Sequence, residues 1–424
     1  MSSAAPLDPH WRLRYILLAP HRLGFSLAAA VLIAASLWWA LVQVDRATGA
    51  FGLPTDGTPP LITHAALMSF GFIPLFFSGF LFTAGPKWLD VEPLSVRQIQ
   101  TPLFMQCAGW LVWLLGGLFS EPLGLLGLAV AWLGLVWMSW LYAGLVRASR
   151  AANQMHGKMV RAAFVVGCVS VAGLGLSLLL QRYDLALAWV LTGLWGFVGV
   201  VFMTVAHRMI PFFTHGKLPG VEAWRPAWVM GVLALAVGAQ AVFVWLSMVQ
   251  WPVWLAMVGL MLRTCFELLI GVWLIWLTVR WGLMTAIKIP LLGMLHIGFL
   301  WLGLTQLIAA ATDAWSAVAP GAPVWHLAAL HAFTMGCLGS LMVAMVSRVA
   351  AGHSGRPLEA GPFFWGLFLL LQVTVVIRVV AALPMAASTS LLALAAVLWL
   401  AIMAAWGGRL LGWWGRVRID GHPG

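Results

Sequence analysis

Long apolar runs recur along the whole chain, separated by short breaks rich in Pro, Gly and charged residues. The runs are about 20 residues long, the length that an α-helix needs to cross the hydrocarbon core of a bilayer. They lack the alternation of apolar and polar positions that is typical of a membrane-spanning β-strand. Because only helices and closed barrels satisfy the backbone in lipid, the pattern predicts an all-α polytopic membrane protein.

Twelve runs qualify as spans, and the eighth is long and contains both Arg263 and Glu267. The predicted spans cover residues 23–44, 61–83, 101–120, 123–146, 158–180, 185–207, 227–248, 252–279, 289–311, 325–347, 361–383 and 388–411. Because the loops between them are short, we expect no soluble domain. The predicted organisation is a cytoplasmic N-terminal arm (1–22), a single twelve-helix transmembrane domain (23–411) and a cytoplasmic tail (412–424).

The composition supports a lipid environment and changes how the basic charge is interpreted. The sequence is 62% hydrophobic and only 8% charged, against about 25% charged residues in an ordinary soluble domain. An excess of 23 Lys and Arg over 12 Asp and Glu would suggest a nucleic-acid partner in a soluble protein. Here membrane topology explains the excess, so we expect the lipid bilayer, and no nucleic acid, as the partner.

The basic residues are distributed unequally between the two sides of the predicted bundle. Of the 23 Lys and Arg residues, 19 fall in the two termini and in every second loop, and the other loops carry only Arg46 and Arg182. The remaining two, Arg263 and Arg378, lie within spans. Since cytoplasmic loops are enriched in Lys and Arg, both termini are predicted to be cytoplasmic. The charge distribution thus gives the predicted twelve-span protein a defined orientation in its membrane.

Eleven histidines are the main candidates for chemistry. Four lie in terminal or loop segments, where we expect contact with water: His10, His21, His156 and His422. Imidazole within a bilayer is costly and marks either a site or a buried hydrogen bond. Seven histidines fall in or beside spans: His64, His207, His215, His296, His326, His331 and His353. The predicted topology places His64, His326 and His331 towards the outer face, and the other four towards the inner face.

The outer histidines suit a haem. His64 and His331 enter the second and tenth spans from the outer side at similar depth, and two imidazoles from different helices can fill both axial positions of a haem iron. Arg378, near the outer end of the eleventh span, is the candidate partner of the propionates. His326 precedes His331 by five residues, a rotation of about 140° on a helix. Both can face one site only if His326 precedes the regular helix.

Small and soft residues accompany these two histidines. Met68 and Met335 each follow a histidine by four residues, and thioethers are soft ligands for copper. Glycines that could lie against a flat cofactor follow as well: Gly71, Gly79, Gly336 and Gly339. If copper is present, four further histidines are its candidate ligands: His207, His296, His326 and His353.

The spacing of these residues is also compatible with purely structural roles and with transport. Each histidine could form an interhelical hydrogen bond, and glycines are common in helix packing without any cofactor. Arg263 and Glu267 share one helix face and could be a structural pair or part of a proton relay. A transporter of a metal or small molecule, using intramembrane His and Arg/Glu residues, is therefore the alternative function.

Longer stretches of the sequence resemble the NnrS family of bacterial membrane proteins. The similar segments are 64–89 (HAALMSFGFIPLFFSGFLFTAGPKWL), 207–214 (HRMIPFFT), 295–304 (LHIGFLWLGL) and 331–358, which ends in GHSGRPL. The resemblance implies a haem- and copper-containing inner-membrane protein associated with nitric oxide and nitrosative stress. It matches five histidines to the family's motifs: His64, His207, His296, His331 and His353.

A more distant similarity is to the main subunits of haem–copper oxidases, which also place histidines in the second and tenth of twelve helices. The chain lacks an adjacent His-His pair, and Pro211 stands four residues after His207, where those subunits have a tyrosine. We therefore do not expect ordinary oxidase activity. The predicted function is to bind or react with nitric oxide at a b-type haem, and catalytic residues, the electron donor and the enzyme reaction stay open. A haem-dependent oxidoreductase acting on nitric oxide or a related nitrogen species is one form that this function could take.

Overall fold

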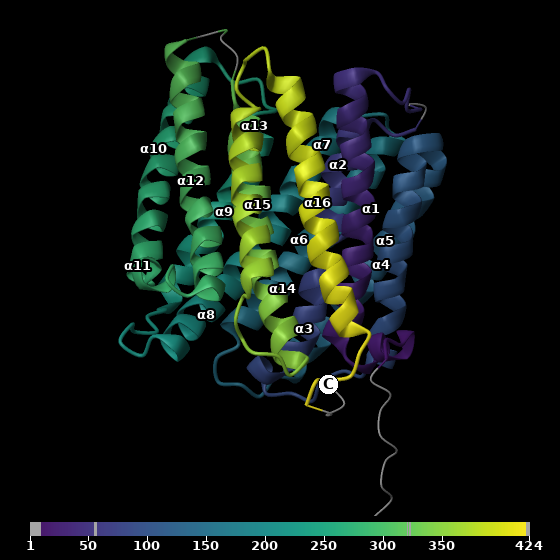
Figure 1. Ribbon diagram of the computed structural model, residues 1–424. Helices are drawn as coiled ribbons and strands as arrows, with labels where there is room; N and C mark the ends of the chain where they lie inside the picture. The colour runs from purple at the N-terminus through teal and green to yellow at the C-terminus, as the bar shows by residue number, and fades with distance from the viewer. Residues whose placement is uncertain (1–9, 55–56, 320, 322–323, 421–424) are drawn as a thin grey trace, which may run out of the picture.

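The computed structural model describes residues 10–54, 57–319, 321 and 324–420. Within these residues the chain is helical and contains no strand, and twelve helices are long and apolar enough to cross a membrane. Figure 1 shows them side by side in one bundle, running between two opposite ends. The predicted all-α polytopic fold is confirmed. His422 lies outside the described residues.

The first six spans are formed by the N-terminal half of the chain. Their elements, with the short helices beside them, are η1 (Leu13–Leu18), α1 (Pro20–Thr48), α2 (Pro60–Ala66), η2 (Leu67–Gly71), α3 (Ile73–Leu89), α4 (Val96–Phe119), α5 (Glu121–Ala148), α6 (Met155–Leu179), α7 (Tyr183–Gly193), η3 (Leu194–Gly199) and α8 (Val200–Lys217). The second and sixth spans are composite, because α2, η2 and α3 form one and α7, η3 and α8 form the other.

The remaining six spans follow in the C-terminal half. Their elements are α9 (Ala227–Leu246), α10 (Val253–Arg280), α11 (Leu283–Ala286), α12 (Pro290–Val318), α13 (His326–His331), η4 (Ala332–Gly339), α14 (Ser340–His353), α15 (Pro362–Val380) and α16 (Ser388–Trp414). The tenth span is again composite, formed by α13, η4 and α14. The segments η2, η3 and η4 are π-helical, whereas η1 is a 3₁₀-helix.

The first and last described segments of the chain meet at one end of the bundle. The backbone N–H of Arg12 donates to the carbonyl of Gly415 at 2.7 Å, and the Trp11 indole donates to Leu411 at 3.0 Å. Arg22 donates from its guanidinium to the carbonyl of Arg416 at 2.7 Å. This end, at the bottom of Figure 1, is called the inner end below, and the opposite one the outer end. That the inner end faces the cytoplasm stays a prediction.

Two histidines that we expected to contact water are buried. His21 has 1% and His156 8% of its surface exposed. The cause is that α1 begins at Pro20 and α6 at Met155, each three residues before the predicted span, so both histidines lie in the first turn of a packed helix. The prediction of solvated side chains is wrong for this pair.

The helices α4 and α5 pack closely through glycines. A Cβ atom at Gly116 would collide with the backbone of Gly124. One at Gly127 would lie 2.5 Å from the backbone nitrogen of Trp113. Small residues allow two membrane helices to approach to backbone contact, and dispersion then stabilises the pair. These glycines therefore allow α4 and α5 to lie in close contact.

Candidate functional site

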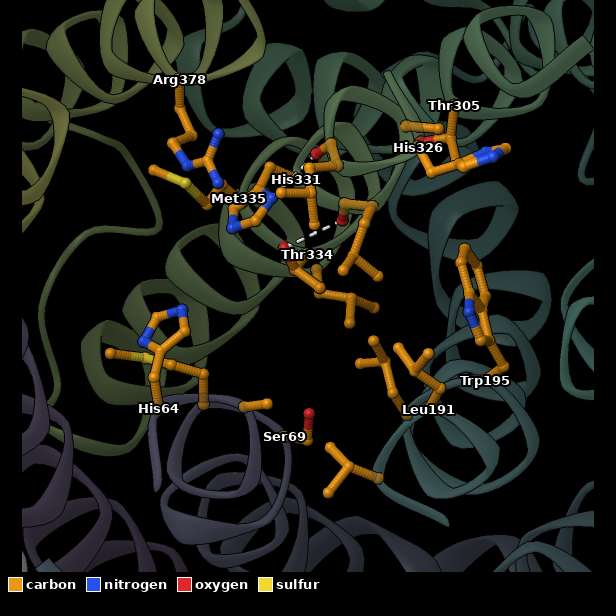
Figure 2. Close-up of a pocket in the computed structure, with 18 of the residues that line it drawn as sticks. His64, Ser69, Leu191, Trp195, Thr305, His326, His331, Thr334, Met335 and Arg378 are labelled. Atoms are coloured by element: carbon orange, nitrogen blue, oxygen red, sulfur yellow. Dashed lines mark hydrogen bonds between the residues drawn. The ribbon is translucent and has the colours of Figure 1, made fainter. Parts of the chain in front are cut away.

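A cavity of about 510 Å³ opens between the helices in the outer half of the bundle. Its volume falls in the range of about 300–1,000 Å³ that is typical of small-molecule sites. Most of its wall is apolar, and the polar exceptions include His64, His326, His331, Arg263 and Arg378. In Figure 2, His64 lies on one side of the cavity, His331 and Arg378 lie above His64, and His326 lies on the far side. The structure therefore brings together the outer histidines and Arg378, as the sequence predicts.

All three π-helical segments contribute to the wall of this cavity. Met68 belongs to η2, Trp195 to η3 and Met335 to η4, and each lines the cavity. A π-helical turn inserts an extra residue into an α-helix and is frequent at functional sites. The segment η2 follows His64 and η4 follows His331 within one turn. Irregular helix is thus concentrated around the cavity.

The imidazole of His64 is held by an aromatic stack. The centroids of the His64 and Trp39 rings are 3.8 Å apart, and the two ring planes make an angle of 16°. Its Nδ1 is buried and has no hydrogen-bond partner in the part of the chain that the structure describes. A buried nitrogen without a partner is unfavourable unless a ligand occupies it. His64 therefore lines the cavity with a ring that has one nitrogen available for a ligand.

His331 is oriented by its own helix. Its Nδ1 lies 2.9 Å from the carbonyl oxygen of Leu327, so Nδ1–H donates and Nε2 keeps a lone pair. A backbone carbonyl that accepts from one ring nitrogen is the usual support of a histidine that binds a metal through the other. His331 lines the cavity from the last position of α13.

Arg378 supplies positive charge to the same cavity. It lines the wall from the outer end of α15, and its Nη1 is buried without a hydrogen-bond partner among the described residues. An ionisable side chain within a membrane is costly and indicates a functional group or a charged partner. The position suits an anionic substituent of a ligand.

His326 belongs to a different part of the cavity. It is the first residue of α13, and its side chain is 54% exposed. Its Nδ1 lies 3.9 Å from Oδ1 of Asp313, which is an ion-pair distance when the imidazole is protonated. Asp313 is a site residue that was not predicted, because the expected span ends at 311 while α12 continues to Val318.

The predicted pair of Arg263 and Glu267 is present. Arg263 Nε lies 3.0 Å from Oε1 of Glu267 and 3.0 Å from Oδ2 of Asp313. Arg263 lines the cavity, whereas both carboxylates lie behind its wall and are almost completely buried. One cation thus serves two carboxylates beside the cavity.

The inner histidines form separate pairs. His156 Nε2 lies 3.0 Å from His207 Nδ1, and His207 Nε2 lies 3.1 Å from the carbonyl of Pro226. His296 Nε2 lies 2.9 Å from the hydroxyl of Thr214. A third pair places the rings of His21 and His353 at 4.2 Å between centroids.

These pairs show which ring nitrogens of the predicted copper ligands are already used in hydrogen bonds, but they do not test copper binding. Among the described residues, no three His, Cys, Asp or Glu side chains gather as a metal site. His207 uses both ring nitrogens in hydrogen bonds, so it could bind a metal only by losing one of them. The role of the inner histidines as metal ligands stays a prediction.

Three of the four glycines proposed for cofactor contact have another role. A Cβ at Gly71 would meet Val31, one at Gly79 would meet Phe25, and one at Gly336 would meet Trp301. These positions allow neighbouring side chains and helices to approach, and none of the three is among the residues that line the cavity. Gly339 does line the cavity, beside Trp399.

The fold and this cavity define a polytopic α-helical membrane protein with a histidine-lined pocket in one half of the bundle. The family model described as NnrS protein matches residues 15–418, nearly the whole chain, and the chain belongs to the NnrS family. This membership fits a membrane protein of the nitric oxide response. No curated protein matches the chain.

Proposed function

We propose that the cavity binds one b-type haem between His64 and His331, and that the protein binds or transforms nitric oxide there, in a bacterial inner membrane. The observation that carries the proposal is the pairing of two imidazoles from separate spans on one cavity, each with a ring nitrogen that has no partner among the described residues. Family membership supports the link to nitric oxide.

The side chains present fit such a group. A bound haem supplies an iron that accepts a gas ligand and changes its oxidation state. The chain supplies the rest: Leu327 holds the tautomer of His331, Trp39 holds the ring of His64, and the guanidinium of Arg378 can pair with a propionate. Apolar walls exclude water, which strengthens the electrostatic interactions inside.

Copper is the second group that the family resemblance implies. The pair of His21 and His353 gives it donors that are not occupied by other side chains, because neither ring has a hydrogen bond to another described side chain. Imidazole is a suitable copper ligand. Nearby cationic groups, which include Arg22 and Lys87, oppose a bound cation there. We therefore assign the haem to the outer cavity and leave copper to a direct metal analysis.

A transporter is the rival function, and one observation favours it. Arg263 reaches the cavity and is backed by two buried carboxylates, an arrangement also used in proton-coupled transport. Transport predicts flux of a metal or small molecule across vesicles without a bound chromophore. Haem binding predicts a bound chromophore and no such flux.

The test is an optical spectrum of the purified protein, supplied with haem during expression, before and after reduction and after addition of nitric oxide. We expect a Soret band that shifts in both steps. His64→Ala and His331→Ala should each change it, and the double variant should lose it. His215→Ala, at an exposed histidine of the inner end, is the matched control.

Two further variants keep the test informative if an alanine variant misfolds. His64→Met and His331→Met retain a possible iron ligand and should shift the band without abolishing it. Elution of every variant as a single species in detergent shows that the fold is intact. A haem-supplied wild type without a Soret band, or a folded double variant with an unchanged band, contradicts the proposal.

A further inference from the structure

Two buried carboxylates lie directly behind the cavity wall. Glu267 and Asp313 have 0% and 1% of their surface exposed, and they come from α10 and α12. Glu267 stands 14 residues into α10, about 21 Å along the helix axis from its outer end. Asp313 lies much nearer to the outer end of its helix. Glu267 is therefore the deeper of the two.

The charges around these carboxylates do not balance. The only guanidinium that contacts them is that of Arg263 among the described residues, with 3.0 Å to each. The other group close to the pair is His326, which is neutral unless it is protonated. If both carboxylates were ionised, one negative charge would remain uncompensated in a buried site. Such a charge is so costly that the group instead takes up a proton.

The polar contacts of the two carboxylates locate the proton. Oε1 of Glu267 accepts from Arg263 Nε and from Gln240 Nε2, both at 3.0 Å. Oε2 of Glu267 is buried and has neither a hydrogen-bond nor an ion-pair partner among the described residues. Oδ2 of Asp313 is also buried without a hydrogen bond, but it lies 3.0 Å from Arg263 Nε, and Oδ1 of Asp313 faces His326. An ionised oxygen without a donor is far less favourable there than a neutral hydroxyl. Both carboxylates contact Arg263, but only Glu267 has an oxygen without any polar contact among the described residues, so the proton belongs on Glu267 Oε2.

Polar side chains connect this carboxyl to both the cavity and the outer end. Gln240 and Arg263 contact Glu267 and also line the cavity. Towards the outer end, Arg263 contacts Asp313, whose other oxygen faces His326. His326 is more than half exposed. Gln240 also donates to Gln306, and Gln306 donates to the carbonyl of Ala236, which fixes the amide in place.

We infer that Glu267 is a proton-holding group that compensates changes of charge in the cavity. The groups that act on it are Arg263 on α10, Asp313 on α12 and His326 on α13, while α9 contributes only the neutral Gln240. The coupling to the cavity rests on the proposed function, in which reduction of a bound haem adds the charge. The presence of the proton on Glu267 does not rest on the proposed function, because it follows from the carboxylates and their contacts alone.

A purely structural network would not need this composition. One carboxylate is sufficient to neutralise Arg263, and a second one adds the cost of burial without a second cation. In a structural network, Glu267→Gln would be a neutral replacement that changes no proton count. The proton-holding role predicts that this replacement removes a titratable proton.

The first experiment is infrared spectroscopy of the detergent-solubilised protein at pH 7, with or without haem. A protonated buried carboxyl gives a C=O band that shifts in deuterium oxide. We expect one such band in the wild type, its loss in Glu267→Gln, and its retention in Glu222→Gln, which alters an exposed carboxylate. Arg263→Gln should add a second protonated carboxyl, because both acids then lack a cation.

The second experiment counts protons taken up when the haem-loaded protein is reduced in unbuffered solution with a pH indicator. We expect a substantial fraction of one proton per electron in the wild type and a loss of most of it in Glu267→Gln, with the Soret band unchanged. A wild type without the infrared band, or a Glu267→Gln variant that keeps it, overturns the inference even if haem is bound. Absence of the Soret band with the infrared result intact contradicts the proposed function alone.

Discussion

The indole of Trp39 stacks face to face on the imidazole of His64, with 3.8 Å between the ring centroids and 16° between the planes. The contact joins α1 to α2 and restricts rotation of the His64 ring. An aromatic pair of this kind contributes about 0.5–1.5 kcal/mol beyond its buried area. Trp39→Leu should therefore weaken haem binding roughly two- to tenfold, measured as faster transfer of haem to an excess of apomyoglobin.

The matched control is Trp140→Leu, which removes an indole that is 62% exposed on α5. It takes away a similar aromatic surface but leaves the ring of His64 stacked. Haem release at the same rate from both variants would show that the stack does not orient the histidine.

The span pattern was predictable because it depends on local sequence. Apolar runs and the unequal distribution of Lys and Arg define twelve crossings, and the described part of the chain contains twelve helices long and apolar enough to cross a membrane. Helix ends are less well defined, since a packed first turn can contain polar residues. His21 and Arg22 illustrate this: each has 1% of its surface exposed because the terminal segments close over them. Pro20, a residue favoured in the first turn of a helix, is the signal that indicates the true start.

The site was predictable only in part. Depth along the spans correctly grouped His64 and His331, because depth follows from the helical rise. The stack on Trp39, the contact of Asp313 with Arg263 and the pairing of His156 with His207 depend on which faces of distant helices meet. A single sequence holds no record of those contacts. The π-helical segments have no simple sequence signature either.

Glycine packing between α4 and α5 leads to a stability prediction with an internal control on one helix. Gly127→Ala places a methyl group against the backbone of Trp113 and should destabilise the protein by about 1–3 kcal/mol. Gly144→Ala, also on α5, has no neighbour within 4 Å and should be neutral or stabilising by up to about 1 kcal/mol. Thermal unfolding in detergent measures both, and equal melting temperatures of the two variants would contradict the packing assignment.

The inner histidine pairs lead to a prediction on metal content. If copper binds at the inner end, His353→Ala should lower the copper-to-protein ratio and leave the Soret band unchanged, because His353 does not line the cavity. His207→Ala should leave the copper ratio unchanged and reduce stability, because it leaves His156 without its partner. Elemental analysis after dialysis against a chelator measures the ratio. A loss of copper in His207→Ala with retention in His353→Ala would contradict this prediction and indicate His207 as the ligand.

Arg378 provides the sharpest test of how a haem would lie in the cavity. Its guanidinium has a buried Nη1 without a partner among the described residues, so a propionate there would gain a charge-assisted hydrogen bond of about 1.5–3 kcal/mol. Arg378→Gln should weaken haem binding roughly tenfold to a hundredfold, and Arg378→Lys by less. The control Arg150→Gln, at an exposed arginine of the inner end, should have no effect.

Haem dimethyl ester, which lacks the propionate charges, separates pairing from shape. If Arg378 pairs with a propionate, wild type and Arg378→Gln should bind the ester with equal affinity, because the charge that the guanidinium recognises is absent from it. If Arg378 acts only by supporting α15, the variant should bind both haems more weakly than the wild type by the same factor. Titration of the protein with each haem, followed at the Soret band, distinguishes the two results.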